Sequence, residues 1–111
     1  MFYRFGACKL DPVRRVLTQD ECEVALTPKT FDLLFYLVQN PNRVVSKDEL
    51  FAHLWPDSFV EERNLSQHVF LLRKALAGAD GDRLILTVPG RGYRLGVEVE
   101  LLGERGPTPS R

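Results

Sequence analysis

The 111-residue sequence has no long apolar segment, only two cysteines and no excess of either charge. Its longest apolar run, from Leu33 to Val38, is far shorter than the roughly 18 residues that a membrane-spanning helix needs. No apolar stretch of the length found in secretory signal peptides follows Arg4. We therefore expect a cytoplasmic protein, with membrane tethering through a further segment left open.

The two cysteines, Cys8 and Cys22, both fall in segments that read as strands. A thiol in such a position usually behaves as a small buried hydrophobe, and disulfides are uncommon in the cytosol. We expect both thiols to be reduced and structural, with a disulfide or a redox switch as the alternative.

Patterns typical of catalysis and of cofactor binding are also missing. His53 and His68 have no Cys, Asp or Glu partners at the spacing of metal ligands. No glycine-rich loop leads from a strand into a helix, as nucleotide-binding folds require. The sequence therefore predicts a protein that is not an enzyme, with no cofactor and no metal. His68, beside an apolar stripe, is expected to pack or to hydrogen-bond inside the fold.

The formal net charge of zero conceals an uneven distribution along the chain. Between residues 63 and 94, six basic residues stand against two acidic ones, so this segment carries +4 and the rest −4. Because charges are screened over about 8–10 Å in physiological salt, binding of a polyanion depends on a local patch rather than on the total. A solvated surface with scattered charges explains the pattern equally well.

The first 26 residues lack helical periodicity and alternate short apolar segments with turn signals. Strands are expected at residues 2–5, 8–10, 15–17 and 22–26. Their close spacing implies hairpins, and hence a small antiparallel sheet.

Helical patterns occupy the middle of the chain. A first helix is expected between Thr27, a good N-cap that precedes Pro28, and the turn that begins at Asn40. Apolar residues spaced at i, i+3, i+4 and i+7 predict its buried face: Phe31, Leu34, Phe35 and Val38.

A second helix is expected from Ser46, which forms a capping-box pattern with Glu49, to Pro56. A short strand at Val44-Val45 precedes it. After a loop at residues 56–60, a third helix spans about residues 61–76. Its predicted buried stripe consists of Leu65, Val69, Leu72 and Leu76.

The side of this third helix opposite the stripe carries Arg63, Gln67, Phe70 and Lys74, with Asn64 and Leu71 at its margin. Arg, Asn and Gln have paired hydrogen-bonding groups that read base edges in the major groove, which is wide enough for a helix. An ordinary solvated helix face is an equal alternative. Phe70 and Leu71 are unusual there, and we expect one of them to pack against the hairpin that follows; thymine methyl groups or a second protein are the other options.

An apolar hairpin is expected at residues 84–88 and 93–99, after turn residues at 78–81. Arg91, between two glycines, stands on a protruding turn from which it can enter a narrow minor groove; a solubilising charge is the alternative. Tyr93 is expected in the core, opposite to Arg94. Residues 103–111 are rich in Gly and Pro and predict a disordered tail or linker, which leaves residues 1–102 as one domain.

Taken in order, these motifs resemble the effector domain of the OmpR/PhoB family of response regulators, from about residue 5 to residue 95. The motifs that carry the resemblance are LTPKTFDLL from Leu26, NP at Asn40, VSKDEL from Val45, LWP from Leu54, RNLSQHV from Arg63, LRKAL from Leu72 and TVPGRGYR from Thr87. No single motif is decisive, but the whole series is highly specific.

The resemblance implies an α+β winged helix-turn-helix with a four-stranded N-terminal antiparallel sheet, three helices and a C-terminal β-hairpin wing at residues 84–97. It implies sequence-specific binding of double-stranded DNA for transcription regulation, by two copies head to tail on direct-repeat sites. Base readout is implied for Arg63, Asn64 and Gln67, and contacts through the DNA backbone or the wing for Arg73, Lys74, Arg91 and Arg94; Arg73 matches either a phosphate-facing or a structural arginine. The loop that can contact RNA polymerase is implied to be Pro56, Asp57, Ser58, Phe59 and Val60.

The sequence departs from the family at two places. Pro89 stands where many members have Arg, and Phe70 and Leu71 stand where basic residues are common. Because no receiver domain stands before the sheet in this sequence, we expect an arrangement that resembles the ToxR/CadC type, in which the DNA-binding domain comes first; a sequence that is one part of a longer regulator would look the same. A winged-helix adaptor that binds a protein through Phe70 and Leu71 is the second hypothesis, and an enzyme is the third.

Overall fold

The N-terminal segment folds into an antiparallel meander in the computed structural model, which describes residues 2–76 and 81–102. Strands β1 (Phe2–Phe5), β2 (Cys8–Asp11), β3 (Val16–Gln19) and β4 (Cys22–Val24) pair in sequence order. The four expected strands are therefore present, with boundaries shifted by a residue or two. The strand β8 (Glu100–Leu102) adds a fifth, antiparallel to β1.

In the described part of the chain the sheet is followed by the helices α1 (Pro28–Gln39), α2 (Lys47–Leu54), α3 (Glu62–Ala75) and the single-turn α4 (Gly81–Leu84). The first two begin as predicted, because the hydroxyl of Thr27 accepts a hydrogen bond from the Thr30 amide and that of Ser46 accepts one from the Glu49 amide. The short helix α4 was not expected, since the sequence predicts a turn that ends at Gly81 and a strand that begins at Leu84; the strand begins at Ile85 instead. The predicted turn residues 78–80 and the predicted tail at 103–111 lie outside the described residues.

Glu49 does not complete the capping box with its side chain. Its carboxylate instead accepts hydrogen bonds from the Tyr36 hydroxyl and from Arg43, whose Nη1 lies 3.1 Å from Oε1. These bonds from Arg43, and then that from Tyr36, lower the pKa of Glu49 to about 2. A charged donor makes a stronger hydrogen bond than a backbone amide does, which explains the exchange.

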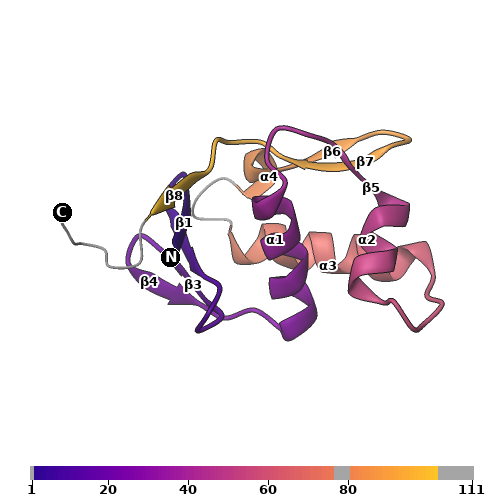
Figure 1. Ribbon diagram of the computed structural model, residues 1–111, viewed down its shortest axis with the longest axis horizontal. Helices are drawn as coiled ribbons and strands as arrows, with labels where there is room; N and C mark the ends of the chain where they lie inside the picture. Colours follow the sequence, from indigo (N-terminus) through magenta and orange to yellow (C-terminus); the bar gives the residue numbers. More distant parts are fainter. Residues whose placement is uncertain (1, 77–80, 103–111) are drawn as a thin grey trace.

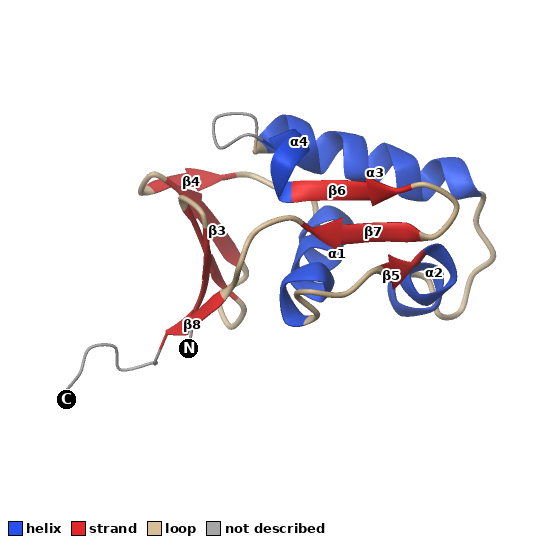
Figure 2. Ribbon diagram, turned by 90° about the horizontal axis from the view of Figure 1, so that it is seen from above, coloured by secondary structure: helices blue, strands red, loops and turns tan. Residues whose placement is uncertain are grey.

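A second sheet forms where the C-terminal hairpin meets a strand from the middle of the chain. Strands β6 (Ile85–Val88) and β7 (Gly92–Leu95) form the hairpin, and β5 (Val45–Ser46) pairs with β7. The N-terminal sheet lies at one end of the molecule, and α2 and the tip of the hairpin lie at the other (Figures 1 and 2).

The prediction of one strand over residues 93–99 is wrong, because β7 ends at Leu95 and the chain then crosses to the N-terminal sheet as β8. Gly96 lies at the crossing. A Cβ there would be 2.1 Å from the carbonyl oxygen of Arg83, so only glycine fits this close approach. The amide of Gly96 donates to the carbonyl oxygen of Leu84 over 2.7 Å.

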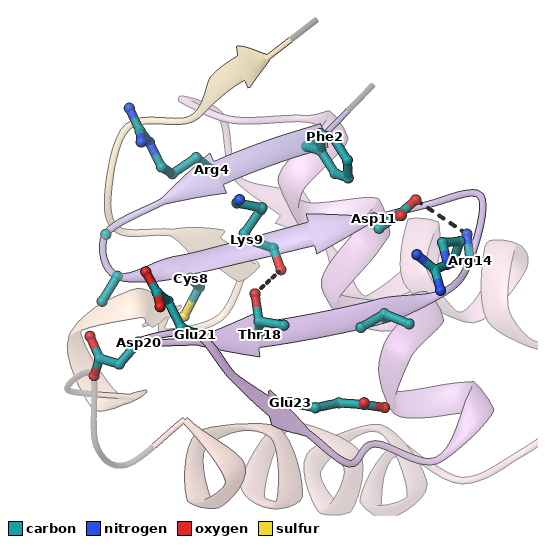
Figure 3. Close-up of a pocket in the computed structure, with 13 residues that line it drawn as sticks. Phe2, Arg4, Cys8, Lys9, Asp11, Arg14, Thr18, Asp20, Glu21 and Glu23 are labelled. Carbon is teal, nitrogen blue, oxygen red and sulfur yellow. Dashed lines mark hydrogen bonds between the residues drawn. The ribbon is translucent and has the colours of Figure 1, made fainter. Parts of the chain in front are cut away.

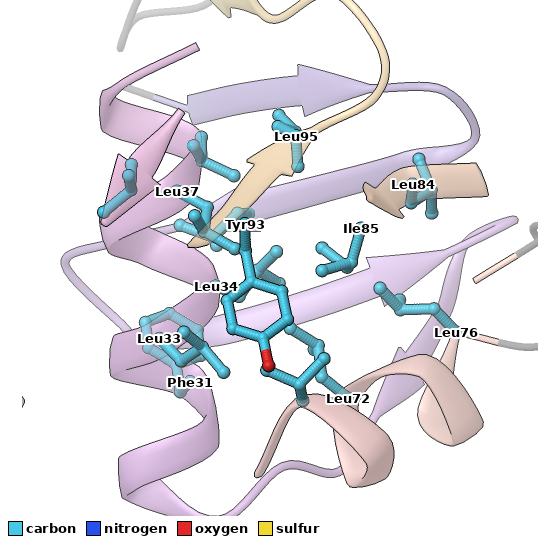
Figure 4. Close-up of a cluster of buried hydrophobic side chains, with 14 of the residues drawn as sticks. Phe31, Leu33, Leu34, Leu37, Leu72, Leu76, Leu84, Ile85, Tyr93 and Leu95 are labelled. Carbon is cyan, nitrogen blue, oxygen red and sulfur yellow. The ribbon is translucent and has the colours of Figure 1, made fainter. Parts of the chain in front are cut away.

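The core is one cluster that joins the inner face of the N-terminal sheet, helices α1, α2 and α3 and the β6–β7 hairpin; Figure 4 shows part of it. The predicted stripe of α3 is buried at every position: Leu65, Val69, Leu72 and Leu76. On α1 the buried face is wider than predicted, since Leu33 and Leu37 are also buried and Phe35 is only half-buried. This follows from the central place of α1, which contacts both α3 and β7.

The two cysteines differ in environment. Cys8 is buried on β2, but Cys22, on the edge strand β4, is exposed, so the expectation of two buried thiols is wrong for Cys22. Both are free. Burial, followed by the nearby charge of Asp20, raises the pKa of Cys8 to about 11, which keeps this thiol protonated and unreactive.

Within the described ranges, none of the helices combines the length and the apolar character needed to cross a membrane.

Candidate nucleic-acid interface

Helix α3 presents a polar side to solvent because its apolar residues repeat at helical spacing and are buried beneath it. Four of the residues predicted to contact DNA are exposed along this helix: Arg63, Asn64, Gln67 and Lys74. The side chain of Arg63 is 84% exposed, and its partner among the described residues is the carboxylate of Glu61, 3.4 Å from its Nε, in a pair that water screens. The polar side is therefore not covered by the described parts of the protein.

Phe70 and Leu71 lie among these polar residues. The side chain of Phe70 is 57% exposed and that of Leu71 is 37% exposed. We expected one of them to pack against the hairpin, but neither is buried. The ammonium of Lys74 lies 5.6 Å from the centre of the Phe70 ring, a cation–π contact one helical turn apart.

Arg73 links α3 to the hairpin. Its Nε and Nη2 donate to the carbonyl oxygen of Ile85 over 3.0 and 2.6 Å, and Nη2 also donates to the Thr87 hydroxyl over 2.8 Å. These bonds fix the position of β6 relative to α3. Of its two implied roles, phosphate contact or structure, the geometry favours the structural one.

The hairpin tip is a tight turn from Val88 to Arg91, closed by a 2.9 Å hydrogen bond from the Arg91 amide to the Val88 carbonyl. Gly90 has φ +74°, and Pro89 precedes it, which is the residue pair that a type II turn favours. Pro89 is thus explained by the turn that it stabilises. Arg91 is exposed beside the tip, while Arg94 is half-buried on β7.

Tyr93 is buried as expected, with 6% of its surface exposed, and its neighbour Gly92 makes a close approach to β5. A Cβ on Gly92 would lie 2.0 Å from the Val45 carbonyl oxygen and 2.8 Å from the Ser46 Cα. The glycine therefore lets β5 pair with β7 at the base of the turn.

The loop predicted to contact polymerase connects α2 to α3. Pro56, Asp57 and Ser58 are exposed, Val60 is half-buried, and the Phe59 side chain projects fully into solvent. A single hydrogen bond from the Ser58 amide to the Trp55 carbonyl, at 3.3 Å, begins the loop.

A polar cluster that the sequence pattern did not reveal joins α1, α2 and α3. Its centre is His68, whose Nδ1 lies 3.0 Å from the buried Thr30 hydroxyl and whose ring lies 5.7 Å from that of Trp55. Lys29 lies over Trp55 and donates to the carbonyl oxygen of Leu54 over 2.5 Å. The prediction that His68 packs and hydrogen-bonds within the fold is confirmed.

The stability of the domain should fall as the pH drops below about 6.5, because burial and, second, the nearby Lys29 lower the pKa of His68. The unfolded chain then binds the proton more readily than the folded domain does. The contribution of His68 is therefore complete above its ordinary pKa of 6.5 and is lost as the pH falls towards the lowered value.

Urea unfolding of the wild type and of His68→Asn, from about pH 7.5 down to about pH 5, measures this effect. Asparagine can hydrogen-bond to Thr30 but does not titrate. We expect a flatter pH dependence for the variant, and an equal loss of stability in both proteins would contradict the role assigned to His68.

A cavity of about 650 Å³ opens on the face of the N-terminal sheet that is turned away from the helices (Figure 3). Its lining mixes both charges, with Arg4 and Lys9 beside Asp11 and Glu23. Ligand sites usually enclose most of their ligand, whereas this hollow is open to solvent. In residues 2–76 and 81–102, no three His, Cys, Asp or Glu side chains are grouped so as to hold a metal ion.

Comparison with known families gives a match over residues 20–95 to the family described as "Transcriptional regulatory protein, C terminal". The chain is 45% identical over 82 residues to the uncharacterized transcriptional regulatory protein YclJ of Bacillus subtilis, covering 73% of this chain and 36% of that protein. It is 37% identical over 86 residues to the phosphate regulon transcriptional regulatory protein PhoB of Escherichia coli, covering 77% and 38%. The chain thus spans a little over a third of the length of these relatives.

Two solved structures share the architecture. The DNA-binding domain of Escherichia coli CadC superimposes with a TM-score of 0.79 at 34% identity, covering 89% of this chain and 94% of that one. The Klebsiella pneumoniae RstA DNA-binding domain, in complex with the RstA box, gives 0.73 at 26% identity, covering 85% and 95%. The chain therefore belongs to the C-terminal domain family of transcriptional regulatory proteins and has the winged helix-turn-helix fold of the OmpR/PhoB type.

Proposed function

We propose that this domain binds double-stranded DNA in a sequence-specific manner to control transcription, with α3 as the recognition helix in the major groove. The wing, which we define as residues 85–95, would reach the adjacent minor groove. The observation that carries the proposal is the uncovered polar side of α3, seated on buried leucines and joined to the wing by Arg73. The complex of the similar RstA domain with its DNA box supports it.

Each exposed side chain has a role that its chemistry suits. Arg63, Asn64 and Gln67 lie along the first two turns of α3, where the N-terminal part of a recognition helix meets base edges. Lys74 and the wing residues Arg91 and Arg94 supply positive charge for phosphates or for the narrow minor groove. Arg73 holds the helix and the wing at a fixed angle, so that both can engage one duplex.

We further propose that two copies bind head to tail on direct repeats and that the loop at residues 56–60 can contact RNA polymerase. The full exposure of Phe59 supports the second part, because a large apolar side chain that contributes nothing to the core suits a protein contact. We also propose a cytoplasmic location and a role that is not enzymatic. Residues 103–111 would serve as a tail or a linker.

Selection of bound sites from a random duplex pool, followed by salt titration, tests this function. We expect enrichment of spaced direct repeats and an affinity that falls steeply with salt, by a log–log slope of about −0.9 for each neutralised phosphate. Failure to bind any duplex at low salt, together with tight binding to a protein, would favour the adaptor hypothesis instead.

Arg91→Ala should weaken binding and should change the preference for A·T pairs that flank the site. The reason is that an arginine at the wing tip is attracted to the enhanced negative potential of a narrow minor groove. Arg14→Ala is the matched control, because it removes the same charge from an exposed turn of the N-terminal sheet. Equal affinities of the wild type and Arg91→Ala would exclude the wing tip from DNA contact.

A further inference from the structure

Phe70 and Leu71 lie midway along α3 and belong to the side that we propose to enter the groove, with Leu71 at its margin. Phe70 lies one turn after Gln67 and one turn before Lys74, and Leu71 also lies one turn after Gln67. Around the helix, the two apolar side chains therefore lie on either side of Gln67 and Lys74. Both are exposed, at 57% and 37%. They contribute little to the core of the isolated domain.

The contact with Lys74 defines how the Phe70 ring is presented. The ammonium lies over the ring, 5.6 Å from its centre, and at an exposed site such a contact favours this placement only weakly. A phenyl ring in this place offers an apolar surface directly beside groups that hydrogen-bond. The ligand should therefore display apolar and polar groups within a few ångströms of one another, on a negatively charged scaffold.

The floor of the major groove has this character. Among the groups that base pairs expose there, the C5-methyl of thymine is the apolar one, and hydrogen-bonding atoms surround it. A protein partner fits less well. The apolar area that two side chains offer, among the polar Arg63, Gln67 and Lys74, is far smaller than the roughly 800 Å² that each side of a stable interface buries.

We propose that Phe70 and Leu71 are specificity-determining residues that contact thymine C5-methyl groups, so that the operator has thymine where these side chains meet the groove. This inference rests on the proposed function of α3. It also explains why apolar residues are compatible with a DNA-binding face. Compared with basic residues at these positions, they attract the phosphates less but distinguish thymine from other bases by apolar contact.

The test replaces thymines of the selected site, one at a time, by deoxyuridine, which pairs identically but lacks the methyl group. We expect one or two positions at which the wild type binds the uracil duplex about fourfold more weakly, the effect of removing one buried methyl group. At these positions Phe70→Ala or Leu71→Ala should bind both duplexes equally. Val13→Ala, an exposed apolar residue in the turn between β2 and β3, should behave as the wild type does.

The outcomes separate this inference from the function on which it rests. Salt-dependent, site-specific binding without any thymine–uracil difference would overturn the thymine contact and leave DNA recognition standing. The thymine contact would also be overturned if both Phe70→Ala and Leu71→Ala still distinguished the thymine duplex from the uracil duplex as the wild type does. Unchanged DNA affinity in these two variants, together with loss of binding to a protein, would overturn it too. Absence of all duplex binding by the wild type would instead remove the proposed function itself.

Discussion

Gly92→Ala should destabilise the domain by about 3 kcal/mol, at the upper end of the usual cost of overpacking, and should displace the wing. The added Cβ would lie 2.0 Å from the carbonyl oxygen of Val45, which belongs to the backbone of β5 and cannot rotate away. Either β5 separates from β7 or the hairpin shifts. Because Ser46 of β5 is also the N-cap of α2, the start of that helix should be disturbed too.

Gly90→Ala provides the matched control for this prediction. Gly90 has φ +74°, so alanine there is strained by about 1–2 kcal/mol, but nothing lies within 4 Å of the added Cβ. Urea unfolding of both variants separates backbone strain from steric conflict. Gly92→Ala should also lose affinity for DNA by more than Gly90→Ala does, and equal stabilities of the two variants would show that β5 can yield without cost.

The features that local sequence predicted correctly are those that local interactions determine. The caps at Thr27 and Ser46 depend on a hydroxyl and an amide three residues apart, and the buried stripe of α3 depends on helical spacing alone. The exposure of Arg63, Asn64 and Gln67 follows from the same spacing. These elements could be predicted because each is determined within one or two helical turns.

The features that sequence did not predict depend on contacts between distant segments. Strand β8 pairs with β1 across nearly the whole chain, and Arg73 donates to a carbonyl 12 residues away on β6. The partnership of His68 with Thr30 joins residues 38 positions apart. No local period carries such information, so a solvent-facing arginine and a structural one look alike in the sequence.

The sequence also did not predict which apolar side chains at the margins of the fold remain exposed. Alternation in a strand indicates which side a residue faces, but not whether a neighbouring layer covers that part of the sheet. Cys22 is exposed on the edge strand β4 although its segment reads as an ordinary strand, and Phe70 is exposed although it is aromatic. Only the assembled fold distinguishes an apolar residue that fills the core from one that remains available to a ligand.

Arg63→Ala should reduce affinity for the selected site by about 1–3 kcal/mol, or roughly five- to 150-fold, and should relax specificity at one base position. The side chain lies in the first turn of α3 and is 84% exposed, and among the described residues its ion-pair partner is the solvent-screened carboxylate of Glu61. Little is lost when it leaves that carboxylate for a base edge. The guanidinium can then make two parallel hydrogen bonds to guanine, a pattern that no other base displays in the major groove.

Two comparisons decide whether Arg63 reads a base or only attracts the duplex. Arg63→Lys keeps the charge but loses the planar fork, so it should retain binding to random DNA and still lose most of the preference for the selected site. Arg63→Ala should show a much smaller loss on random DNA than on the selected site in filter-binding or fluorescence titrations at one salt concentration. Equal losses on both duplexes would assign Arg63 to phosphate contact, and the readout would then fall to Asn64 and Gln67 on the same side of α3.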